Sequence, residues 1–211
     1  MSLSRRQQLF FDGIEQSFNH IRLTYDRITS AVPFLFTAPV DKSKLEGVTL
    51  DAWTVVDIGK RLYSLIMNMP GLAGTPAIEL YLRQLASVED FRHYIQHLDG
   101  KTIAVANTSL PLWGWLAFLC RTGDGKIKSA GYHPGRAVTG EYPILNPAGK
   151  TFHAAVDHVT LFNLTGEINI SELFRHAISL EMPLVTAIKK AEEDGTRNSK
   201  GLLRIVIDSL Q

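Results

Sequence analysis

The sequence predicts an α+β fold in which a bundle of four helices carries a small antiparallel β-sheet, inserted before the last helix. Apolar residues recur every three or four positions in the first hundred residues and again after residue 171, as they do in helices packed on one face. Between these regions, from about residue 112 to 170, short apolar or alternating runs are separated by turns, which is typical of antiparallel strands. A chain of 211 residues is expected to form one domain over residues 1–211.

The first two helices are expected over residues 5–30 and 49–69. In the first, one stripe of apolar side chains follows the helical period: Phe10, Ile14, Phe18, Ile21, Tyr25 and Ile28. Residues 31–48 contain prolines and a glycine and predict a packed connection. The second helix should end at Pro70-Gly71, because proline has no N–H group to donate and glycine is flexible.

A third helix is expected over residues 76–99. Thr75 is a candidate N-cap, and Pro76 suits the first helical position, where its missing N–H has no partner in any case. Gly100 is expected to end this helix in the left-handed conformation.

The inserted sheet is predicted from turns and alternation. Residues 113–121 and 126–132 should pair as a hairpin about Gly123–Gly125. After a long loop, residues 153–164 and 167–170 indicate two more strands, and a three- or four-stranded antiparallel meander is the simplest assembly.

The last helix is expected over residues 172–194, with Ser171 as its cap and a kink or break at Pro183. Gly195 should stop it. The apolar segment 202–210 is predicted to pack as a strand or an ordered arm.

Composition excludes several function classes. The formal net charge of +1 argues against a broad, unspecific nucleic-acid surface. The single cysteine, Cys120, excludes an intrachain disulfide and a cysteine-based zinc site, and its apolar surroundings predict a core residue. No apolar run is long enough to span a membrane, and Ser4–Gln7 leads straight into an amphipathic pattern, so a cytoplasmic protein is expected. No cofactor is expected.

The segment Asp90–Gly100 holds the densest group of chemically competent side chains. Arg92, His93 and His97 lie within two helical turns. Histidine can transfer protons near neutral pH, whereas arginine stays charged and presents a planar fork of donors to phosphate oxygens. This combination suits phosphodiester cleavage without a metal ion.

An arginine, a polar residue and a histidine a few positions later form a motif that resembles the HEPN superfamily of small helical-bundle proteins. Many members are metal-independent ribonucleases, and the motif residues of two paired subunits meet across a dimer cleft. The resemblance covers the four helices and implies a homodimer with an RNA or nucleotide substrate. It further implies His97 as general acid or base, Arg92 as phosphate stabiliser and His93 as a supporting polar group.

Three alternatives stay open. The chain could be a non-catalytic helical scaffold or binding module for a protein partner or small ligand. In this alternative, Arg92 and Glu89 are surface ion-pair partners and the two histidines cap or line the helix end. Glu89, His93 and His97 fall four residues apart and share a helical face, so a metal site is a second alternative, although no metal is expected. The aromatic residues of the insertion could form a stacking wall, but a core role is favoured (Trp113, Trp115 and Tyr132).

Overall fold

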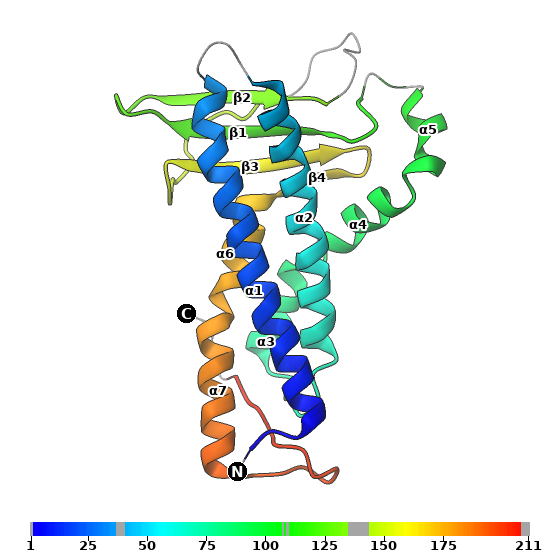
Figure 1. The fold of residues 1–211 in the computed structure, drawn as a ribbon, viewed down its shortest axis with the longest axis vertical. Coiled ribbons are helices and arrows are strands. Elements are labelled where there is room, and N and C mark those ends of the chain that lie inside the picture. Colours follow the sequence, from blue (N-terminus) through cyan, green and yellow to red (C-terminus); the bar gives the residue numbers. More distant parts are fainter. Residues whose placement is uncertain (1, 37–40, 107, 109, 135–143, 208–211) are drawn as a thin grey trace. The chain divides into compact units, whose positions relative to one another are not determined.

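The computed structural model describes residues 2–36, 41–106, 108, 110–134 and 144–207. It confirms the predicted α+β class (Figure 1). Within the described residues, the elements are α1 (Arg5–Ala31), the 3₁₀ helix η1 (Val32–Phe36), α2 (Lys42–Met67), α3 (Pro76–Gln84), α4 (Val88–Gln96), α5 (Leu98–Ala106), β1 (Trp115–Arg121), β2 (Ile127–Tyr132), β3 (Val156–Asn163), β4 (Gly166–Asn169), α6 (Ile170–Ser179) and α7 (Glu181–Asp194). None of these helices is both long and apolar enough to cross a membrane.

The chain divides into two compact units. The helical unit comprises Met1–Arg22, Ile58–Ala86 and Leu173–Gln211, and the sheet unit comprises Leu23–Asp57 and Ser87–Glu172. The helices α1, α2 and α6 each contribute residues to both units. The expectation of one domain stays a prediction.

The sheet unit contains a four-stranded antiparallel sheet in the order β2-β1-β3-β4. The predicted hairpin is confirmed, because β1 pairs with β2 across a turn in which Gly125 has a φ of 79°. The expected meander order is wrong, because β3 pairs with β1 and leaves β2 at the edge. The strands β1 and β3 bury almost every residue and therefore occupy the centre, whereas β2 exposes half of its residues.

Both faces of the central strands are covered. The parts of α1 and α2 that belong to the sheet unit cross one face (Figure 1), and on β1 the ring of Phe118 meets Phe36 edge to face at 5.9 Å. On β1 and β3, Trp115 stacks on Phe162 at 4.8 Å, which confirms Trp115 as a core residue. Trp113, by contrast, is 48% exposed.

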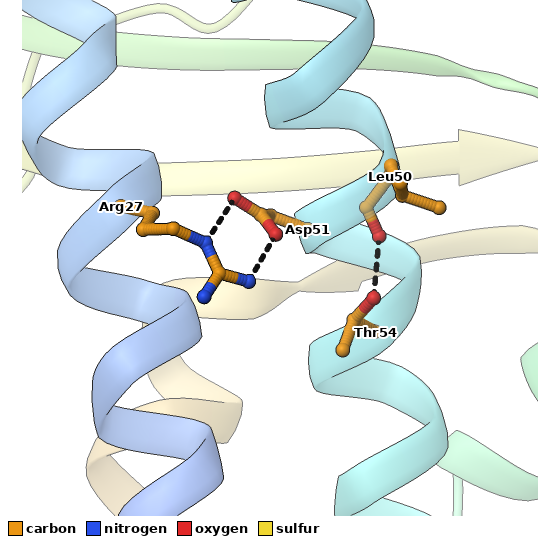
Figure 2. A network of polar contacts seen from close by, with 4 residues as sticks. All are labelled: Arg27, Leu50, Asp51 and Thr54. Carbon is orange, nitrogen blue, oxygen red and sulfur yellow. Dashed lines mark hydrogen bonds and ion pairs between the residues drawn. The ribbon is translucent and has the colours of Figure 1, made fainter.

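An ion pair links α1 to α2 within the sheet unit (Figure 2). Arg27 donates from Nε to one carboxylate oxygen of Asp51 at 3.1 Å and from Nη2 to the other at 2.6 Å. Because each oxygen receives its own donor, the pair fixes the relative orientation of the two side chains.

The helix α2 begins earlier than the sequence suggested. It starts at Lys42 because the Asp41 carboxylate accepts a hydrogen bond from the Ser43 amide at 3.0 Å and so caps the first turn. The expectation that residues 42–48 belong to a connection is therefore wrong. Val32 and Leu35 of η1 are buried, which agrees with a packed segment before it.

The single helix expected over residues 76–99 is wrong: the chain forms α3, α4 and α5 instead. Its start is confirmed, since the Thr75 hydroxyl accepts a hydrogen bond from Ile78 N and Pro76 is the first helical residue. The break at 85–87 contains neither proline nor glycine. Gly100 lies inside α5 and does not end a helix, because His97 already leaves the helical conformation, with a φ of −117° and a ψ of 37°.

The predicted break near Pro183 is confirmed, because α6 ends at Ser179 and α7 begins at Glu181. Gly195 ends α7 with a φ of 65°, as expected. Ser171 is not the cap. The Asn169 carboxamide oxygen accepts from the Glu172 amide at 3.1 Å, while Ser171 is fully buried.

The segment that follows α7 packs within the helical unit as an ordered arm. Gln7 fixes it through its carboxamide, which donates to Leu203 O at 2.8 Å and accepts from Leu203 N at 3.3 Å. Its alternate apolar residues are buried (Leu203, Ile205 and Ile207). The prediction of an ordered arm is confirmed for residues 202–207, and residues 208–210 lie outside the described part.

Candidate functional site

The helix α4 carries Arg92 and His93, ends at His97 as its C-cap, and is held by aromatic packing inside the sheet unit. Its inward face comprises Val88, Phe91 and Tyr94, which follow one another at steps of three and are buried. Trp53 of α2 lies against this face, with its ring centroid 6.1 Å from that of Phe91 and 6.2 Å from that of Tyr94. The tryptophan and Tyr94 rings are nearly parallel, which is a favourable stacked arrangement.

Two aromatic hydrogen bonds attach the chain before β1 to the same cluster. The Tyr94 hydroxyl donates to Leu112 O at 2.8 Å, and Trp53 Nε1 donates to Trp113 O at 3.1 Å. Burial raises the pKa of Tyr94, so this phenol stays a neutral donor at physiological pH. The inward face of α4 is therefore fixed by both packing and hydrogen bonds.

Arg92 lies at the margin of this packed face and forms an ion pair. Its Nε donates to an Asp57 carboxylate oxygen at 2.9 Å, and the side chains are 31% and 36% exposed, respectively. Within the described part of the chain, the terminal amino groups of Arg92 donate no hydrogen bond. The guanidinium is thus oriented through one edge while its other donors stay available to a ligand.

The histidines of α4 are exposed. The ring centroids of His93 and His97 lie 4.5 Å apart and the ring planes are inclined by 52°. His97 is the C-cap residue of α4, and its amide donates to the carbonyls of His93 and Tyr94. The structure therefore brings two proton-transfer groups together at one helix end.

The histidines of the sheet region do not join this pair. Among the described residues, no group of three or more histidine, cysteine or acidic side chains could hold a metal ion. His158 is buried in β3, where its Nε2 is 2.9 Å from Thr151 O, and its φ of 52° marks an irregularity in the strand. The three-ligand metal site considered from the sequence is therefore not assembled within the described part.

Asp57 is the site residue that the sequence did not reveal. It lies one helical turn after Trp53 on α2 and 35 residues before Arg92. The only local signal is its spacing from an aromatic residue on the same helical face, and that spacing identifies no ion-pair partner.

A hollow lies in the helical unit, between α7 and the arm, with a volume of about 280 Å³. Its lining contains charged side chains of both signs over small apolar residues, and it includes no histidine, cysteine or serine: Ala187, Lys190, Ala191, Asp194, Thr196, Arg204 and Val206. This lining offers no group for proton transfer near neutral pH, so α4 is the better candidate for chemistry.

Compared with models of known families, with curated proteins and with solved structures, the chain gives no match.

Proposed function

We propose that the chain is a HEPN-like protein that acts as a metal-independent endoribonuclease, with its site on α4 and with two copies paired as a homodimer. The observation that carries this proposal is the closeness of two exposed imidazoles, His93 and His97, at the end of the helix that also carries Arg92, whose guanidinium is oriented by a carboxylate. A four-helix bundle with the sheet as an insertion is the arrangement that the proposal implies for the fold.

The proposed reaction uses the 2′-hydroxyl of the substrate as nucleophile. A neutral imidazole takes the hydroxyl proton as the oxygen attacks phosphorus, and the bond to the 5′-oxygen breaks as that oxygen gains a proton. The products are a 2′,3′-cyclic phosphate and a free 5′-hydroxyl. His97 is the proton-transfer group, and His93 supports it from 4.5 Å away, measured between ring centroids.

Arg92 would stabilise the charge that builds on the phosphate oxygens in the transition state. Asp57 is a positioning residue in this scheme, because it holds Nε at 2.9 Å and leaves the terminal donors to the phosphate. Its negative charge also offsets part of the guanidinium charge, so the orientation that it provides has to outweigh this loss of attraction.

The test is cleavage of single-stranded RNA by the purified chain, with and without a chelator. His97→Ala and Arg92→Ala should each lower kcat by about a hundredfold or more, whereas His93→Ala should do less. Activity should persist with the chelator and should vary with pH near neutrality, because the proton-transfer group is a histidine.

Asp57→Asn provides a sharper test of the positioning role. It keeps the side-chain shape and removes the charge, and we expect kcat to fall by roughly tenfold with a smaller change in KM. Asp51→Asn is the matched control, since Asp51 lies on the same helix and also pairs with an arginine, Arg27. Equal, low activity in the wild type and in the His97 and Arg92 variants would refute catalysis here.

A second candidate function is a non-catalytic helical binding module for a protein partner or small ligand. The ion pair with Asp57 favours it, because a half-exposed Arg92–Asp57 pair on neighbouring helices is an ordinary structural contact. Ile103 of α5 is 78% exposed, so a substitution there tests contact with a partner without disturbing the core. Under this function, Ile103→Asp would abolish partner binding, whereas the proposed nuclease activity would be unchanged.

A further inference from the structure

We infer that His93 and His97 form a chelating site for a late first-row divalent cation, with Cu²⁺ and Ni²⁺ preferred over Zn²⁺. His93 lies on α4, His97 is the C-cap residue four positions later, and both rings are exposed. Imidazole is a good ligand for these ions, and two exposed imidazoles whose centroids lie 4.5 Å apart can reach one ion by side-chain rotation.

The ring separation indicates the geometry of the site. A metal ion about 2.0–2.1 Å from a ring nitrogen lies about 3.2 Å from the ring centroid. For an ion that takes one nitrogen from each ring, two centroids 4.5 Å apart subtend roughly 90° at the ion. A right angle between neighbouring ligands suits the tetragonal geometry of Cu²⁺ and Ni²⁺ better than the tetrahedral geometry of Zn²⁺.

The positive charge of the neighbouring arginine is partly offset. Asp57 pairs with Arg92, and this pairing reduces the repulsion that Arg92 would exert on a bound ion.

Two protein ligands leave the remaining positions of the ion to water or to a further ligand. No group of three or more metal-binding side chains occurs in the part of the chain that the structure describes, so the site is open and exchangeable. Because affinity in such a site follows the general order of divalent ions, Cu²⁺ should bind most tightly. This inference does not rest on the proposed cleavage, since an inactive protein would bind the ion equally well.

The experiment is titration of the full chain, purified without a histidine tag, with Cu²⁺ alone, followed by calorimetry and electron paramagnetic resonance. We expect one tight ion per chain, with nitrogen coupling from two imidazoles. His93→Gln and His97→Gln should each weaken binding at least tenfold, while His20→Gln should not, because His20 is an exposed histidine on α1 with no histidine four residues away.

Equal affinity in the wild type and both α4 variants would overturn the inference. Weakening in only one of them would show binding by a single histidine and would also overturn the chelate. Circular dichroism of each variant verifies that α4 has not unfolded, and the direct binding readout separates this result from any failure of RNA cleavage.

Discussion

Replacing Ser171 by alanine should destabilise the protein far more than the loss of one hydroxyl group suggests. Ser171 is fully buried at the start of α6, and its Oγ accepts two hydrogen bonds, each 2.9 Å long. One comes from the Tyr25 hydroxyl and the other from the backbone amide of Val159. The irregularity at His158 interrupts the ladder between β1 and β3, so the serine replaces a strand partner for this amide.

The expected magnitude follows from what the substitution leaves behind. A buried donor without a partner costs about 1–3 kcal/mol. Ser171→Ala leaves the Val159 amide as such a donor, and it also removes the hydrogen bond that the Tyr25 hydroxyl donates to Ser171. A loss of roughly 2–4 kcal/mol in the free energy of unfolding is therefore expected, since Tyr25 keeps some access to solvent. Tyr25→Phe removes only one donor and leaves the bond to Val159, so it should cost about 0.5–1.5 kcal/mol.

The assay is urea unfolding of the two single variants and the double variant, followed by circular dichroism. The control is Ser17→Ala, because Ser17 is also buried but its hydroxyl only donates to Gly13 O within α1. The two variants should couple, so that Ser171→Ala costs less in the Tyr25→Phe background. A change for Ser171→Ala no larger than that for Ser17→Ala would refute the reasoning.

Two further predictions concern the sheet unit. Gly114→Ala should destabilise the protein by more than about 2 kcal/mol, because Gly114 has a φ of 72° and an added Cβ would lie 2.1 Å from Phe162 O. Gly125→Ala is the control, because Gly125 has a φ of 79° but an added Cβ would lie in open space. It shares only the backbone strain and should cost about half as much in the same unfolding assay. Cys120 should react slowly with iodoacetamide at neutral pH, because it is buried and burial raises the pKa of its thiol, and labelling as rapid as in denaturant would contradict this.

Signals that act within a few residues could be read from the sequence. The hairpin turn is an example: the Thr122 amide and carbonyl bond to Lys126 and Gly125, and the glycine supplies the positive φ. Thr75 likewise caps the start of α3 through its own side chain. Gly195 ends α7 through its own backbone conformation. Each of these features requires no information about distant parts of the chain.

The break between α3 and α4 could not be read in this way. The sequence at residues 85–87 has no proline or glycine, and helical spacing continues through it. The break places Phe91 and Tyr94 against Trp53, which is about forty residues earlier in the chain, so tertiary packing decides it. Strand order is likewise nonlocal, because it depends on which strands are buried on both faces.

The candidate site shows the same difference between local and distant signals. A spacing of four brings two side chains together at a helix, so the proximity of His93 and His97 was predictable from the sequence, and it holds although His97 leaves the helical conformation. The electrostatic role of Arg92 was not, because it depends on Asp57, which reaches the site from another helix. A motif therefore identifies which side chains share a surface, but the charge that a substrate or cation meets there is set by residues outside the motif. Arg92 could be oriented for a substrate, or it could only form a structural ion pair. For this reason, substitution of Asp57 distinguishes these two roles more directly than substitution of Arg92 itself.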